Sequence, residues 1–184
     1  MNVNEKFARA VIDSQIHGQE KLKEILWTHS RAVADMALEC AGRRGLAVDA
    51  DFVEQAALLH DIGIVDVYAP DIECYGELPY ICHGIAGGDR LRECGLPRHA
   101  LVCERHTGAG LTVEDIRRQG LPLPLRDMLP LTVEERLICY ADKFYSKSGD
   151  RRRRKPLERV REQMLAHGAD TLARFDAMQR EFGL

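Results

Sequence analysis

The sequence predicts an all-α protein, a single compact helical bundle of about seven or eight helices. Apolar residues recur at intervals of three and four along most of the chain, which is the period of a helix with one buried face. Glycine and proline stand between these segments, and no segment alternates apolar and polar residues in the way that predicts a strand. The length of 184 residues fits one domain, and a hydrophobic content of 45% is enough to form a core.

The first two predicted helices have clear local signals. An apolar stripe that begins at Leu22 predicts a long helix, and Gly42 or Gly45 is expected to end it. Asp51 and Glu54 resemble a capping box that opens the next helix.

The middle of the chain is expected to hold one loop and three short helices. Two prolines and a glycine predict a loop over residues 66–79. Apolar periodicity predicts helices over 80–93 and 97–106, the second beginning with a proline. Thr112 is expected to open a short helix that Gly120 closes.

The C-terminal part is expected to hold an extended connection followed by two helices. Three prolines between positions 122 and 130 disfavour a helix there. Thr132 and Glu135 resemble a second capping box, and a last helix is expected from Pro156 to Phe182. This helix is predicted as an appendage to a core domain that spans about residues 20–148.

Composition argues for a soluble protein of the cytoplasm. A net charge of -3 gives no reason to expect nucleic acid or a membrane as partner, and no apolar run is long enough to span a bilayer. The N-terminal residues are polar and carry no signal-peptide core. A homodimer is possible, but no feature predicts it. We expect the six cysteines to be reduced structural thiols, because none forms a C-x-x-C pair: Cys40, Cys74, Cys82, Cys94, Cys103 and Cys139.

Several ionisable residues fall on the inward faces of separate predicted helices. His29, His60 and His106 each lie four residues after an apolar core position, and Asp142 has the same relation to its own helix. Asp61 follows an apolar run, where a carboxylate is costly to bury unless it is paired or bound to a cation. Imidazole and carboxylate together suit Fe, Mn, Zn, Co or Ni. The alternative is a metal-free helical scaffold with buried His–Asp hydrogen bonds.

The same residues carry a resemblance to a known family. His29, the doublet His60-Asp61 and the distant Asp142 match the ordered H…HD…D signature of the HD-domain metal-dependent phosphohydrolases, and the doublet is spelled HDIG. ERHTGAGLT at 104–112 and the segment ending in ADKF are similar to small prokaryotic HDIG hydrolases. The resemblance covers about residues 28–146. It implies an all-α fold and metal-dependent hydrolysis of a small phosphorylated substrate such as a nucleotide.

The resemblance also implies a ligand set for two divalent metal ions, with Fe, Mn, Zn, Ni, Co and Mg all admissible. A hydroxide held between such ions would attack phosphorus. One metal would be held by His29, His60, Asp61 and Asp142, and the second by Asp61, His83 and His106.

The sequence differs from better-known subgroups of the family, and these differences narrow the range of possible substrates. HD-GYP phosphodiesterases carry a lysine soon after the HD doublet, a GYP segment and a paired HH; here the first two are missing and Arg105 precedes His106. Alarmone hydrolases carry an ED pair where Ile64-Val65-Asp66 stands. Hydrolysis of cyclic-di-GMP or guanosine tetraphosphate is therefore disfavoured. The layout also resembles the bacterial HD hydrolases that split diadenosine tetraphosphate.

Other residues are candidates for contact with the substrate. We predict catalytic roles for Asp61, as the bridging ligand, and for Arg105 and Lys143, as cations beside ligands. Asp66 is a candidate acid or an ordinary loop cap. The basic run RRRRK at 151–155 is a phosphate-binding candidate or a solvated connection.

The loops at 66–79 and 120–130 are expected to set specificity, because loops over a fixed scaffold often do. The glycines of HGIAGG at 83–88 are expected to allow close helix packing rather than to bind phosphate. Two rival functions remain open: a one-metal nucleotidase, and a metal-stabilised regulatory or binding module with little turnover.

Overall fold

The computed structural model describes residues 1–183 and confirms the all-α class. Nine α-helices occur in this part of the chain: α1 (Val3–Gln15), α2 (Glu20–Arg44), α3 (Ala50–Leu59), α4 (His83–Glu93), α5 (Pro97–Arg105), α6 (Val113–Gln119), α7 (Val133–Asp142), α8 (Leu157–Ala166) and α9 (Ala169–Phe182). The shorter elements are the 3-10 helices η1 (Ile62–Asp66), η2 (Pro70–Ile72) and η3 (Tyr80–Cys82) and the strands β1 (Tyr68–Ala69) and β2 (Cys74–Tyr75).

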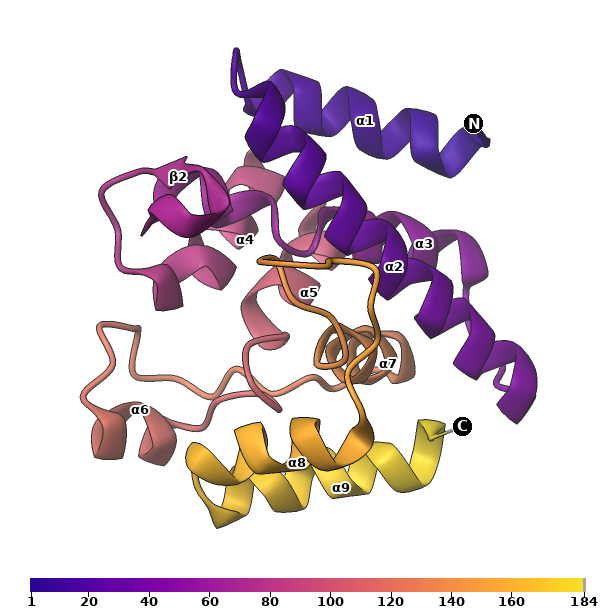
Figure 1. Ribbon diagram of the computed structural model, residues 1–184, viewed down its shortest axis with the longest axis vertical. Coiled ribbons are helices and arrows are strands. Elements are labelled where there is room, and N and C mark those ends of the chain that lie inside the picture. Colours follow the sequence, from indigo (N-terminus) through magenta and orange to yellow (C-terminus); the bar gives the residue numbers. More distant parts are fainter. Residues whose placement is uncertain (184) are drawn as a thin grey trace.

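The helices surround a central group formed by α2, α3, α5 and α7. Figure 1 shows α1 at one end of the molecule and the pair α8 and α9 at the other. α1 packs on α3, α4 packs on both α5 and η1, and α9 packs on α7. One apolar core includes residues of every α-helix except α6, so the C-terminal helices α8 and α9 share the core of the rest. Ile116 of α6 belongs to a second, small cluster with Leu111 and Met128.

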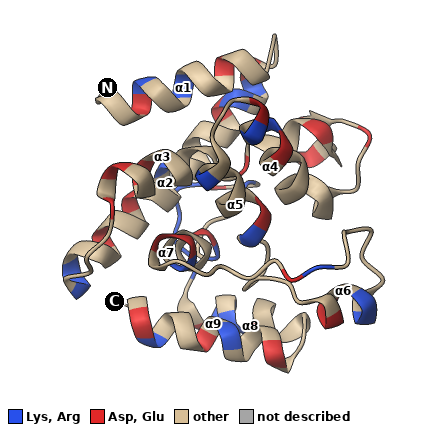
Figure 2. Cartoon of the chain, turned by 180° about the vertical axis from the view of Figure 1, so that it is seen from behind, with Lys and Arg blue, Asp and Glu red and all other residues tan. Residues whose placement is uncertain are grey.

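The surface carries both signs of charge without one dominant field. Figure 2 shows Lys and Arg interspersed with Asp and Glu along the helices, in keeping with the net charge of -3. Within the described residues, no helix is both long enough and apolar enough to cross a membrane. All six cysteines are free thiols.

Helix ends with local signals are close to their predicted positions. Gly45 caps α2 with a φ of 62°, a left-handed conformation that glycine adopts at little cost. Thr112 caps α6 and Gly120 ends it, as predicted. Thr132 accepts a hydrogen bond from the amide of Glu135, but the Glu135 carboxylate binds the amide of Leu131 instead of closing a capping box.

The predicted start of α3 is wrong by two residues. Asp49, not Asp51, is the N-cap, and its side chain accepts a hydrogen bond from the amide of Phe52. With Asp49 as the N-cap, Glu54 lies two residues beyond the N3 position that closes a capping box, and its carboxylate accepts hydrogen bonds from Asn4 and Arg31 instead. A tertiary network therefore overrides the local signal.

Three other elements differ from the sequence expectation. The predicted helix from Pro156 to Phe182 is two helices, because the chain turns at Gly168, whose φ of 125° only glycine readily adopts. The polar N-terminal segment forms α1, which has a complete capping box between Asn2 and Glu5. The predicted loop at 66–79 contains a small antiparallel ribbon of β1 and β2.

His99 gives the fold a testable dependence on pH. Its ring is buried against Phe7 and Phe52, and its Nε2 atom has no hydrogen-bond partner. Burial lowers the pKa of His99 to about 4, with a further contribution from Arg98. The unfolded chain therefore binds this proton more readily than the folded chain once the pH falls below about 6.5.

We expect the free energy of unfolding to fall between pH 7 and pH 5 by about 2 kcal/mol through His99 alone. The free energy of unfolding continues to fall until the pH reaches the pKa of His99 in the folded protein. A His99→Phe variant keeps an aromatic ring in the site and should lack this part of the loss. Urea denaturation of both proteins at the two pH values checks it. Equal losses in both proteins would contradict it, because all other titrations are shared.

Candidate metal centre

Six predicted ligands converge from five helices: His29 comes from the middle of α2, and the other five lie at helix ends. All six are buried: His29 in α2, His60 and Asp61 at the end of α3, His83 at the start of α4, His106 at the end of α5 and Asp142 at the end of α7. These side chains offer ligand atoms in two groups, each spanning less than 4.8 Å.

The first group contains two histidines and two carboxylates. The Nε2 atom of His29 lies 3.0 Å from Oδ1 of Asp142 and 3.2 Å from Oδ2 of Asp61. The Nε2 atom of His60 lies 3.1 Å from the same Asp61 oxygen and 3.4 Å from Oδ1 of Asp142. Two imidazole nitrogens and two carboxylate oxygens around one point are a donor set that suits a divalent transition metal.

The second group uses the other oxygen of the same aspartate. Oδ1 of Asp61 lies 3.4 Å from Nε2 of His83 and 3.3 Å from Nε2 of His106. The two imidazole nitrogens are 3.1 Å apart. Asp61 therefore presents one oxygen to each group, which is the arrangement of a bridging carboxylate.

Backbone carbonyl groups fix the orientation of three of the histidines. The Nδ1 atoms of His60, His83 and His106 lie 2.6, 2.7 and 2.7 Å from the carbonyl oxygen of the residue three positions earlier. Because a carbonyl oxygen only accepts, Nδ1 must carry the proton, and in the neutral ring Nε2 keeps its lone pair toward the site. Such outer contacts are typical of metal-binding histidines.

The residues present fit a metal ion because several polar atoms of the site lack another partner. Oδ1 of Asp61 and Nε2 of His60 are buried without a hydrogen bond, and Oδ2 of Asp61 has an ion-pair partner in Lys147 at 2.7 Å. Buried unpartnered polar atoms are rare and costly. A cation in the first group would satisfy Nε2 of His60, and a cation in the second group would satisfy Oδ1 of Asp61. His29, by contrast, has a buried Nδ1 atom without a partner on the side away from the site.

The charges of the site also favour a cation. Although burial raises the pKa of Asp61 and Asp142, neighbouring histidines and lysines outweigh it and hold both well below the usual range. Burial lowers the pKa of His83 to about 3, so this ring is neutral and able to bind a metal. For His60, the two carboxylates outweigh burial and raise the pKa to about 9. A metal at this group would therefore displace a proton.

Two lysines lie directly on the carboxylates. The Nζ atom of Lys143 is 2.6 Å from Oδ2 of Asp142 and donates a hydrogen bond to the carbonyl of His106 at 2.8 Å. The Nζ atom of Lys147 is 2.7 Å from Oδ2 of Asp61. The sequence predicts a role for Lys143, which follows a ligand, but gives no signal for Lys147, because this residue follows the end of α7 in a segment without helical periodicity.

Two other candidates are not brought to these carboxylates. Arg105 pairs with Glu135, with its Nη1 atom 2.9 Å from the carboxylate, so the structure gives it a contact between α5 and α7. Asp66 forms a two-bond ion pair with Arg90, with both distances 2.6 Å. Its alternative role as an ordinary structural residue of the loop is the one that this geometry favours.

Glycines allow the segments that carry the ligands to approach closely. A Cβ atom at Gly63, the glycine of HDIG, would overlap the backbone of His83 and Gly87. Added Cβ atoms at Gly84 and Gly88 would lie 2.7 Å from atoms of α5. The prediction that the HGIAGG glycines serve close helix packing is confirmed, and this packing places His83 beside Asp61.

Replacing Gly63 by alanine should destabilise the protein by about 1–3 kcal/mol, because backbone atoms of α4 cannot yield as a side chain can. Gly42 is the matched control, since it lies within α2 and a Cβ atom there would meet nothing within 4 Å. Gly42→Ala should raise stability by up to about 1 kcal/mol through helix propensity. Chemical denaturation of both variants tests the pair. A Gly63→Ala protein as stable as wild type would refute the close approach.

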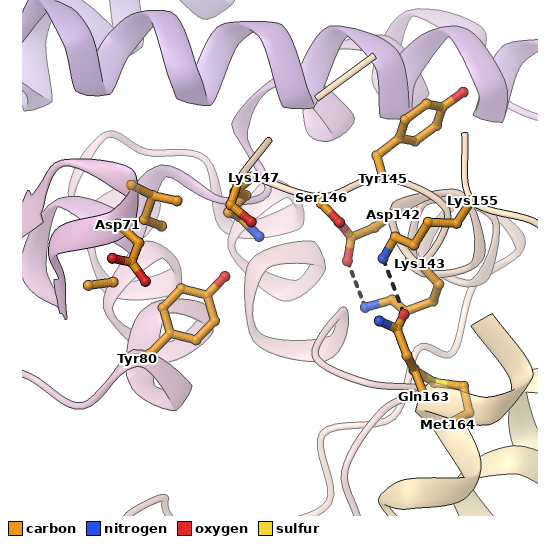
Figure 3. Close-up of a pocket in the computed structure, with 13 residues that line it drawn as sticks. Asp71, Tyr80, Asp142, Lys143, Tyr145, Ser146, Lys147, Lys155, Gln163 and Met164 are labelled. Carbon is orange, nitrogen blue, oxygen red and sulfur yellow. Dashed lines mark hydrogen bonds and ion pairs between the residues drawn. The ribbon is translucent and has the colours of Figure 1, made fainter. Parts of the chain in front are cut away.

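A cavity of about 380 Å³ opens beside the centre. Figure 3 shows Asp71 and Tyr80 on one side of it and Lys143, Lys155 and Gln163 on the other. The loop at 66–79 therefore contributes to its wall, as does α8. None of the lining residues comes from the 120–130 segment.

An all-α scaffold with this His/Asp site defines a metal-binding class of helical protein. The family model for the HD domain matches residues 26–147, and the chain belongs to this family. HD domains bind divalent metals and form a superfamily of metal-dependent phosphohydrolases. The match spans every residue of the two ligand groups.

Curated relatives place the domain in different protein contexts. An uncharacterized protein of Methanocaldococcus jannaschii is 38% identical over 118 residues, which is 62% of this chain and 62% of that protein. Proteins named tRNA (cytidine(56)-2'-O)-methyltransferase from Picrophilus torridus and Thermoplasma volcanium are each 32% identical, over 69% and 70% of this chain. The matched part is 33% of each methyltransferase. No solved structure matches significantly.

Proposed function

We propose that this protein is a metal-dependent phosphohydrolase that cleaves a phosphate ester or polyphosphate bond in a small substrate, with nucleotides as the first class to test. The proposal rests on one observation: Asp61 directs one carboxylate oxygen to each of two ligand groups. Two divalent cations there would lower the pKa of a bound water and neutralise charge on phosphate oxygens.

The protein's own residues support this chemistry in distinct ways. The carbonyl contacts of His60, His83 and His106 hold their Nε2 atoms in place before any ligand arrives. Lys143 and Lys147 stand at the edge of the cavity, where a phosphate group would meet fixed positive charge. No nucleophilic side chain is needed, which leaves the buried Cys103 to its contact with the Leu59 carbonyl.

The direct test is hydrolysis of p-nitrophenyl phosphate and bis(p-nitrophenyl) phosphate by the metal-free protein after addition of Mn, Fe(II), Co, Ni, Zn or Mg. Turnover of either compound that depends on the metal would support the proposal. Metal binding without turnover of these compounds or of a nucleotide panel would favour the regulatory module instead.

The number of metal ions separates the two-metal enzyme from the one-metal nucleotidase. His106 belongs only to the second ligand group, so a His106→Ala variant should lose about one of two bound metals. We expect its hydrolytic rate to fall by roughly 10²-fold or more, since one of two charge-stabilising ions is lost. Elemental analysis of both proteins measures the metals per chain. One metal in each protein would support the one-metal enzyme.

A further inference from the structure

The cavity beside the metal centre contains more positive charge than one phosphate group needs. Three lysines line it: Lys143, Lys147 and Lys155. Lys143 and Lys147 lie on the carboxylates of Asp142 and Asp61. These two carboxylates are also the residues that would hold the cations, and they cannot fully neutralise both the metals and the lysines.

Lys155 is the member of this set without a carboxylate partner in the described chain. Its Nζ atom donates one hydrogen bond, to Oε1 of Gln163 in α8 at 3.3 Å, and among residues 1–183 no Asp or Glu oxygen lies within 4.0 Å of it. Burial lowers the pKa of Lys155, with further lowering by Lys143 and Lys147 and an opposing contribution from Asp142. Figure 3 shows its side chain directed toward Asp142 and Lys143.

A backbone hydrogen bond holds Lys155, the last residue of the basic run, beside the cavity. The amide of Lys155 donates a hydrogen bond to the carbonyl of Phe144 at 2.8 Å, which ties the end of the run to the end of α7. Residues 152–154 of the same run are exposed, and Lys155 alone among these four lines the cavity. The run is thus a solvated connection for most of its length, and its last residue belongs to the site.

Charge balance then indicates the kind of substrate. A phosphate monoester carries between one and two negative charges near neutral pH. Two divalent cations outweigh the two carboxylates that would hold them, and three lysines add to the excess. Asp71 is the remaining acid in the cavity wall. A second phosphate on the substrate would balance this excess.

We propose that Lys155, with Gln163 beside it, binds a second phosphate group of the substrate, so that the enzyme selects small molecules that carry two phosphates. This inference rests on the proposed hydrolase function. Ser146 and Ser148 also line the cavity and offer hydroxyl donors to the same group. The second phosphate can be in one chain with the first or on a separate position of the molecule.

The test compares AMP, ADP and adenosine 3′,5′-bisphosphate as substrates of the wild-type, Lys155→Gln and Arg153→Gln proteins. We expect wild type to prefer ADP or the bisphosphate over AMP, and Lys155→Gln to reduce this preference about tenfold in kcat/KM, mainly through KM. Arg153 is exposed and serves as the matched control, because its change removes the same charge outside the cavity. ADP and the bisphosphate distinguish a phosphate chain from separate phosphates.

Calorimetric binding of the same three nucleotides to the metal-loaded proteins provides a readout that does not depend on turnover. Suppose that p-nitrophenyl phosphate is hydrolysed. If AMP is then as good a substrate as ADP and the bisphosphate, or if Lys155→Gln keeps the wild-type preference for two phosphates, the inference fails while the hydrolase function stands. If nothing is hydrolysed, the function fails. Calorimetry then decides the inference. Tighter binding of ADP or the bisphosphate than of AMP, with a smaller difference in Lys155→Gln, supports it. Equal binding of the three nucleotides, or no binding, overturns it.

Discussion

An Asp61→Asn variant is expected to lose most of both metal ions and at least roughly 10³-fold of its hydrolytic rate. Asp61 directs Oδ2 toward His29 and His60 and Oδ1 toward His83 and His106. An amide keeps the shape of the side chain but removes its negative charge. Both ligand groups are therefore damaged by one change, whereas each histidine belongs to a single group.

Asp66→Asn is the matched control for this experiment. Asp66 is five residues further along the chain and binds Arg90 instead of a ligand group. We expect the control to keep its metal content. Elemental analysis, circular dichroism and p-nitrophenyl phosphate turnover should be measured on the same preparations. An Asp61→Asn protein that is folded and still holds two metals would contradict the bridging role.

Residues whose role depends on helical period could be predicted from the sequence. His29, His60, His106 and Asp142 occupy inward positions of their helices, and periodicity alone indicates this. Their convergence at one point depends on how the helices pack, and periodicity does not predict that packing. The resemblance of the ordered motifs to a known family predicted the convergence. His83 lies on no clear stripe, and only the family resemblance indicated it.

Charged side chains near the ligands could not be placed in the same way. Arg105 precedes His106, but adjacent residues on a helix point about 100° apart, and its guanidinium reaches Glu135 instead. Lys147 lies beyond the end of α7 and reaches Asp61 because of the path of the chain after the helix. The last predicted helix is divided at Gly168, whose φ is 125°, and its two parts, α8 and α9, pack against each other.

Removal of bound metal by a chelator should lower the melting temperature by roughly 10 °C. A ligand present at a thousand times its dissociation constant stabilises the folded state by about 4 kcal/mol, and a chain of this size shifts by a few degrees per kcal/mol. The structural reason lies in Oδ1 of Asp61 and Nε2 of His60, two buried atoms without a hydrogen bond that bound cations would satisfy. Differential scanning calorimetry with and without chelator measures the shift.

The same chelator should have a much smaller effect on Asp61→Asn, because that variant has little metal to lose. The variant also leaves Lys147 beside a neutral side chain, so its melting temperature should be below that of metal-loaded wild type from the start. If chelation instead strips the metal from wild type without moving the melting temperature, the cluster is stable without a cation. The buried histidines and carboxylates would then be a self-sufficient ion-pair network, and the metal would serve chemistry alone.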